Sequence, residues 1–203
     1  IWHPYSSLIK PIPAYQVVSA SGVRLKLSDG TELIDGMSSW WSAIHGYNHP
    51  VLNKALIDQI DKVSHVMFGG ITHEPAATLC KTLVDITPDG LDKVFLSDSG
   101  SVSVEVALKM ALQFWSSQGR FEKSRFLSFK KGYHGDTLGA MSVCDPVNGM
   151  HSLFNHTLDK QIFAEAPICG FHDAWEDRYI YDVKSKLEAN SQNIAAVIIE
   201  PVM

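Results

Sequence analysis

The stretch from residue 94 to residue 129 constrains the fold of this chain more than any other. Val94–Leu96 and Arg125–Phe129 are short apolar runs that predict strands. Between them, apolar side chains recur at helical spacing, at Val104, Ala107, Leu108, Ala111, Leu112 and Trp115. A strand, a helix and a strand within about 35 residues are typical of a βαβ unit. With Ile194–Ile199 as a further buried strand, the sequence predicts an α/β fold on a mostly parallel sheet.

The first ninety residues have a different pattern. Two apolar runs flank Ser21-Gly22, and Ser28-Asp29-Gly30 follows, which predicts a small antiparallel meander. Pro50 opens a helical pattern that runs to about Ile60, and Glu74-Pro75 opens a second that runs to about Val84. We therefore expect a β-rich start, two helices and then the α/β region.

Composition excludes several classes of protein. Of the 203 residues, 45% are hydrophobic and 19% charged, which is typical of a globular chain and not of a disordered or coiled-coil one. A net charge of −5 without a basic block argues against a nucleic-acid surface. No apolar run approaches the ~20 residues that span a membrane, and the first residues do not resemble a signal peptide. The chain lacks an initial Met and stops directly after a strand-like run, so we expect both ends to be cut.

The cysteines and histidines do not predict a disulfide framework or a metal site. Cys80, Cys144 and Cys169 are odd in number and widely spaced, which favours reduced thiols and a cytoplasmic location. His45 and His49 are four residues apart, but Gly46 and Pro50 make that stretch a poor helix. We expect no metal.

The turn Asp98-Ser99-Gly100-Ser101 is the clearest candidate site in physical terms. It precedes the amphipathic helix, whose first N–H groups and dipole attract anions, while Gly allows close approach and Ser adds a hydroxyl. A phosphate site and a plain serine N-cap both fit this pattern. The loop from Lys131 to Thr137 follows a strand, where ligands of open α/β sheets lie, and its Tyr and His could stack on a planar ligand or be ordinary surface side chains.

These segments together resemble the class III aminotransferases of the fold-type I pyridoxal-phosphate family, and within them the branch that serves biotin biosynthesis. The resemblance covers the whole chain, although these residues amount to less than half of the family's usual length. It is carried by Trp2-His3-Pro4-Tyr5, Asp35-Gly36-Met37-Ser38-Ser39-Trp40-Trp41, His45-Gly46-Tyr47-Asn48-His49-Pro50, His65-Val66-Met67-Phe68-Gly69-Gly70, Ser97-Asp98-Ser99-Gly100-Ser101, Gly132-Tyr133-His134-Gly135-Asp136 and Glu200-Pro201.

The resemblance implies a fold, a cofactor and roles for individual residues. It implies a small N-terminal segment with the meander over residues 1–50, and the first part of the large cofactor-binding domain over residues 51–203. The cofactor would be pyridoxal 5'-phosphate, bound by Gly100, Ser101, Tyr133 and Glu200. Tyr133 would also border the substrate, whose pocket Tyr5 and Trp40 would line, with Tyr5 important for activity.

The implied reaction transfers an amino group from S-adenosylmethionine to 8-amino-7-oxononanoate, in a homodimer with active sites at the subunit interface. In this family the Schiff-base lysine and the aspartate that pairs with the pyridinium nitrogen lie beyond Glu200-Pro201. None of the thirteen lysines here stands in the matching context, so these 203 residues alone are expected to be inactive. Another class III enzyme acting on ω-amino donors, or a non-catalytic remnant of a split protein, remain the alternatives.

Overall fold

The computed structural model describes residues 1–147 and 151–201. The chain forms two compact units, Ile1–Asp89 and Gly90–Met203, and each is described by itself. This division follows internal contacts, so the expected family organisation into 1–50 and 51–203 stays a prediction. Among the described residues, no helix is long and apolar enough to cross a membrane.

The first unit begins with the expected antiparallel meander, in the order β1-β2-β3. A two-residue loop joins β1 to β2, and Gly22 adopts a φ of +55° there, which a side chain would disfavour. The strands and the helices that follow are β1 (Val17–Ser21), β2 (Arg24–Leu27), β3 (Glu32–Ile34), α1 (Ser38–Trp41), α2 (Pro50–Ile60) and α3 (Glu74–Ile86). The two longer helices confirm the sequence patterns, and α3 ends two residues later than predicted.

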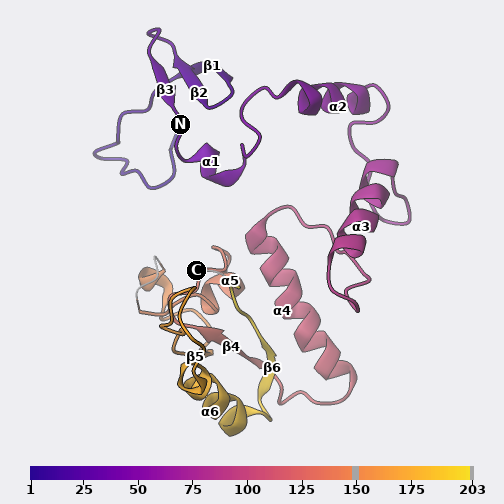
Figure 1. Cartoon of the computed structure of the whole chain (residues 1–203), viewed down its shortest axis with the longest axis vertical. Coiled ribbons are helices and arrows are strands. Elements are labelled where there is room, and N and C mark those ends of the chain that lie inside the picture. The colour runs from indigo at the N-terminus through magenta and orange to yellow at the C-terminus, as the bar shows by residue number, and fades with distance from the viewer. Residues whose placement is uncertain (148–150, 202–203) are drawn as a thin grey trace. The chain divides into compact units, whose positions relative to one another are not determined.

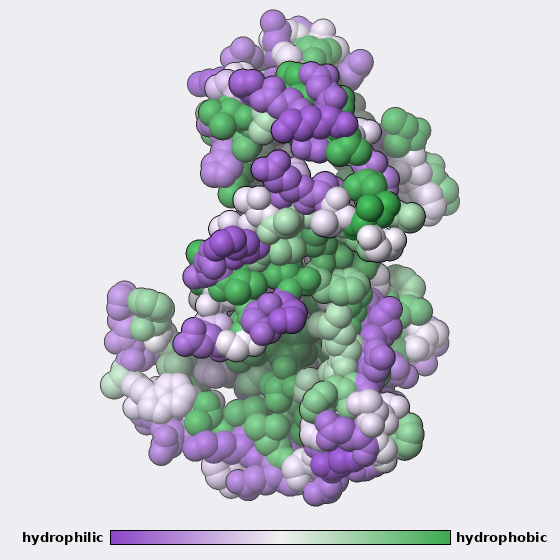
Figure 2. Space-filling model, turned by 90° about the vertical axis from the view of Figure 1, so that its right-hand side faces the viewer, coloured by the Kyte–Doolittle hydropathy of each residue, from purple (hydrophilic) through white to green (hydrophobic). Residues whose placement is uncertain are grey.

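Little of the first unit's apolar surface is buried within the unit. Leu27 and Ala76 are its buried apolar residues among those described, whereas Trp40 is 61% and Trp41 79% exposed. Figure 2 shows apolar residues standing among polar ones on the visible surface. Exposed apolar surface of this kind marks regions that contact other protein surfaces.

The second unit is built on a three-stranded parallel sheet in the order β5-β4-β6. Its elements are α4 (Gly100–Ser117), β4 (Arg125–Phe129), α5 (Leu138–Ser142), η1 (Ser152–Phe154), β5 (Ile162–Ala164), η2 (Asp177–Ile180), α6 (Tyr181–Asn190) and β6 (Ile194–Val197). The parallel pairing confirms the predicted sheet type.

Helices cover both faces of this sheet, α4 on one side and α6 on the other (Figure 1). Side chains of β4 alternate between the faces, so Phe126 packs against Leu108 of α4, whereas Leu127 packs toward Leu187 of α6. Most of the predicted stripe of α4 packs toward the sheet, at Val104, Leu108, Ala111 and Leu112, whereas Ala107 is exposed. Trp115 at its end donates from Nε1 to the Ala195 carbonyl at 2.7 Å. Gly119, with a φ of +72°, follows the helix end as predicted.

The prediction of a strand at Val94–Leu96 is wrong. These residues lie in extended chain without strand pairing among the described residues, and Phe95 is 65% exposed. A strand exists only where its backbone groups pair with a neighbour, and β4 already pairs with β5 on one side and β6 on the other. The βαβ unit predicted over residues 94–129 therefore lacks its first strand. The predicted strand at Ile194–Ile199 also ends early, at Val197.

Candidate functional site

The start of α4 has backbone donors without an acceptor in the part of the chain that the structure describes. Ser99 is the N-cap and its hydroxyl accepts from the Val102 N–H at 3.2 Å, so the predicted cap exists. Within the described residues, no acceptor pairs with the N–H groups of Gly100 or Ser101. A Cβ built on Gly100 would meet nothing within 4 Å. An anion could therefore approach these two backbone donors at the positive end of an 18-residue helix.

The loop after β4 packs directly on this helix start. The Asp136 N–H donates to the Ser101 hydroxyl oxygen at 2.9 Å. Gly135 has a φ of +123°, and a Cβ there would come within 2.8 Å of the Ser101 Cα. Because Gly135 alone permits this approach, the loop and the helix start form one continuous surface. The Ser101 hydroxyl accepts from this loop and keeps its own hydrogen for a further acceptor.

Glu200, which follows the end of β6, contacts the same loop, although 67 residues separate it from Tyr133. Its Oε2 accepts from the Tyr133 N–H at 3.1 Å. β4 and β6 are parallel neighbours, so their carboxyl ends meet at one edge of the sheet. A hollow at this edge is lined by Phe129, Gly132, His134, Pro167, Cys169, Ile199, Glu200 and Pro201. The structure thus brings together four residues that the sequence singled out separately: Gly100, Ser101, Tyr133 and Glu200.

The Tyr133 hydroxyl is held by Asp136. It donates to Asp136 Oδ2 at 2.7 Å, while the other carboxylate oxygen lies 2.8 Å from His151 Nε2. The hydrogen bond from Tyr133, and then that from His151, lower the pKa of Asp136 below its ordinary value. Sequence reasoning quoted Asp136 only as part of a motif and missed His151, which follows in a distant loop with no motif around it.

His134 in this loop is half-buried, and Cys144 beneath the loop is buried. Burial lowers the pKa of His134, and the charge of Glu200 opposes that shift. The backbone N–H of His134 donates to the Cys144 Sγ, with the nitrogen 3.1 Å from the sulfur, and burial raises the pKa of that thiol. Cys144 is therefore a structural side chain and not an activated nucleophile.

In the first unit, Tyr5 and Trp40 lie together. Their rings meet edge to face, with centroids 6.1 Å apart and an interplanar angle of 88°. Trp40 lies in α1, where four consecutive residues, Ser38–Trp41, have φ between +47° and +66°. The two tryptophans therefore lie in a left-handed turn, a backbone conformation that is unfavourable for residues with a Cβ atom.

Asp35 and Tyr47 hold that left-handed turn. The Asp35 carboxylate accepts from the Met37 N–H at 2.9 Å and from the Ser39 N–H at 2.8 Å. The Tyr47 hydroxyl forms short hydrogen bonds with Asp35 and Ser39, and the bond from Tyr47 is the main cause of the lowered pKa of Asp35. Strained backbone fixed in this way is characteristic of functional sites.

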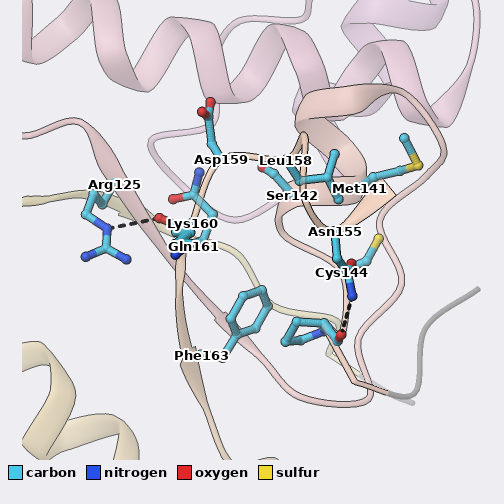
Figure 3. Close-up of a pocket in the computed structure, with 11 residues that line it drawn as sticks. Arg125, Met141, Ser142, Cys144, Asn155, Leu158, Asp159, Lys160, Gln161 and Phe163 are labelled. Atoms are coloured by element: carbon cyan, nitrogen blue, oxygen red, sulfur yellow. Dashed lines mark hydrogen bonds between the residues drawn. The ribbon is translucent and has the colours of Figure 1, made fainter. Parts of the chain in front are cut away.

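A second hollow of the second unit, of about 350 Å³, holds none of the predicted site residues (Figure 3). It lies toward the amino end of β4, where the Arg125 Nε donates to the Lys160 carbonyl at 3.1 Å. Asn155 likewise donates to the Pro146 carbonyl at 3.0 Å. These side chains tie down the loop before β5. Among the described residues there is also no group of three or more His, Cys, Asp or Glu side chains that could hold a metal.

Comparison with known proteins identifies relatives along the whole chain. The family model for class-III aminotransferases matches residues 6–203. Adenosylmethionine-8-amino-7-oxononanoate aminotransferase of Buchnera aphidicola subsp. Acyrthosiphon pisum is 56% identical over 203 residues, which are 100% of this chain and 47% of that protein. The Saccharomyces cerevisiae protein of the same name is 48% identical over 218 aligned residues, which span 100% of this chain and 45% of that protein.

Solved structures share the fold. That of adenosylmethionine-8-amino-7-oxononanoate aminotransferase from Methanocaldococcus jannaschii superposes with a TM-score of 0.86 at 33% identity, over 97% of this chain and 44% of that chain. An omega transaminase from Pseudomonas jessenii in complex with PMP matches with a TM-score of 0.84 at 27% identity, over 100% of this chain and 47% of that chain. The predicted fold class is confirmed, and the chain spans about half the length of the relatives that it matches.

Proposed function

Because this chain belongs to the class III aminotransferase family, we propose that it forms the phosphate-binding part of a pyridoxal-phosphate-dependent aminotransferase. One observation carries the proposal: among the described residues no acceptor pairs with the N–H groups of Gly100 and Ser101, a Cβ on Gly100 would meet nothing within 4 Å, and the loop of Tyr133 is held against this helix start through Asp136. A dianionic phosphate fits these donors, the Ser101 hydroxyl and the helix dipole.

The bound cofactor would supply an electron sink for charge that develops at the carbon bearing the amino group. Gly100 and Ser101 would hold its phosphate. Tyr133, whose side chain is half exposed, would lie against its ring and border the substrate. Glu200 would fix the backbone of Tyr133 and close the edge of the site.

For the substrates, we propose S-adenosylmethionine as amino donor and 8-amino-7-oxononanoate as acceptor, which gives 7,8-diaminononanoate for biotin synthesis. The relatives at 48–56% identity, all named for this reaction, support this choice. Tyr5 and Trp40 would line the substrate pocket, and their edge-to-face contact gives that wall a fixed shape. The second candidate is an aminotransferase for ω-amino donors, favoured by the omega transaminases at 27% identity.

We propose a homodimer in the cytoplasm. The exposed aromatic side chains of the first unit support a protein interface there, and the three unpaired cysteines suit a reducing compartment. The Schiff-base lysine and the aspartate for the pyridinium nitrogen are expected in the part of the relatives' length that these 203 residues do not span.

An activity assay on the complete chain tests the proposal. The chain, loaded with pyridoxal phosphate, is supplied with 8-amino-7-oxononanoate and either S-adenosylmethionine or an ω-amino acid, and 7,8-diaminononanoate is measured by mass spectrometry. We expect product with S-adenosylmethionine and none when the cofactor is omitted. Product only with the ω-amino acid would favour the second candidate, and no transfer from either donor would refute both.

A further inference from the structure

His151 is buried beneath an exposed pair of functional groups. His151 is 7% exposed, whereas Tyr133 is 48% exposed and the Asp136 side chain is 53% exposed. The imidazole lies against the Tyr133 ring, with centroids 6.1 Å apart and planes 25° from parallel. One buried side chain therefore touches both groups that face the site.

The direction of the hydrogen bond is fixed by chemistry. The lowered pKa keeps Asp136 ionised near neutral pH, and a carboxylate can only accept, so His151 Nε2 carries the hydrogen. Asp136 then accepts from His151 on Oδ1 and from the Tyr133 hydroxyl on Oδ2. With both oxygens engaged, rotation of the carboxylate is restricted, and the phenol hydroxyl is held with it.

Of the two imidazole nitrogens of His151, Nε2 is the one that bonds to Asp136. His151 Nδ1 is buried and has no hydrogen-bond partner within the part of the chain that the structure describes.

From this arrangement we infer that His151 is a positioning residue, which orients the Asp136 carboxylate and through it the Tyr133 hydroxyl toward the substrate. The inference deepens the proposed function and rests on it. The Asp136 backbone also donates to Ser101, so the same residue joins the positioned hydroxyl to the start of α4. A fixed distance between the phosphate cradle and that hydroxyl is what substrate orientation requires.

Variants of the complete, cofactor-loaded chain separate the two contacts of His151. His151→Phe keeps a ring against Tyr133 but has no hydrogen for Asp136, whereas His151→Gln keeps a donor. We expect His151→Phe to lower kcat/KM for the amino acceptor about tenfold, and His151→Gln to recover most of it. His156→Phe, at an exposed histidine five residues away, is the matched control and should leave kcat/KM unchanged.

A double-mutant cycle shows whether His151 acts through Asp136. If it does, adding His151→Phe to Asp136→Asn should lower kcat/KM no further, whereas a merely structural loss would add to it. The melting temperature and the dissociation constant of pyridoxal phosphate, measured on each variant, should change little. Additive losses in the cycle, or a Gln variant as impaired as the Phe variant, would overturn the inference.

Crystal structures of the complete chain with pyridoxal phosphate give a readout that does not depend on turnover. In the unsubstituted protein, His151 Nε2 and the Tyr133 hydroxyl should both lie within hydrogen-bond distance of Asp136, and in His151→Phe the hydroxyl should leave it. An Asp136 carboxylate without either contact would overturn the inference even where His151→Phe does not fold. If this geometry is intact but no amino group is transferred from either donor, the proposed function is refuted and the contacts of His151 are not.

Discussion

Gly100→Val should weaken cofactor binding without weakening the fold. A Cβ at this position meets nothing within 4 Å, and Gly100 is not among the glycines with positive φ, so the protein itself has room for the side chain. Valine is also a better helix former than glycine, by about 0.3 kcal/mol. The branched side chain would instead fill the space through which a phosphate reaches the Gly100 and Ser101 N–H groups.

The expected size follows from those donors. A hydrogen bond to a charged group contributes about 1.5–3 kcal/mol, so losing one raises the dissociation constant of pyridoxal phosphate about 10- to 150-fold. Gly100→Ala, which adds a single methyl, should have a smaller effect. Affinity is measured by titrating the complete chain with cofactor, and stability by calorimetry of the cofactor-free chain.

Ser116→Val is the matched control, because it places the same side chain in the exposed last turn of α4. It should leave the affinity unchanged. The expected signature of Gly100→Val is opposed signs: lower affinity, with an equal or higher melting temperature of the cofactor-free protein. A dissociation constant within twofold of the unsubstituted chain would refute the assignment of this helix start to phosphate.

Three further predictions concern the surroundings of the site. Ser101→Ala should lower cofactor affinity and also the melting temperature of the cofactor-free chain, by calorimetry, because the hydroxyl accepts from the Asp136 N–H; an unchanged melting temperature would contradict that contact. Burial holds the pKa of His134 below its ordinary value of 6.5, so as pH falls below about 6.5 the unfolded chain binds a proton before the folded one and the free energy of unfolding falls. That loss should level off below the lowered pKa, and denaturant titrations of His134→Asn should lack it. Tyr47→Phe removes the hydroxyl that binds Asp35 and should raise KM for the substrate more than it changes cofactor affinity, and the reverse pattern would separate this turn from the substrate pocket.

Local patterns predicted the elements that depend on local chemistry. The spacing of apolar residues gave α4 and the serine before it gave the N-cap, because burial of one face and capping act within a few turns. The parallel pairing of β4 with its neighbours also followed from buried apolar runs. The candidate residues after β4 and β6 met because parallel strands end at the same edge of a sheet.

What depends on distant partners could not be predicted in this way. Val94–Leu96 has the composition of a strand, but a strand also needs a neighbour, which no local pattern supplies. The left-handed turn at Trp40 depends on side-chain bonds from Asp35 and Tyr47, and nothing in the letters Ser-Ser-Trp-Trp indicates it. His151 meets Asp136 only through the path of the chain between them.

The crystal structure of the complete chain with pyridoxal phosphate tests the central claim most directly. The account predicts that the phosphate oxygens lie within hydrogen-bond distance of the Gly100 and Ser101 N–H groups and of the Ser101 hydroxyl, with the Tyr133 ring beside the pyridine ring. A phosphate bound away from the start of α4, with those N–H groups still facing solvent, would contradict it.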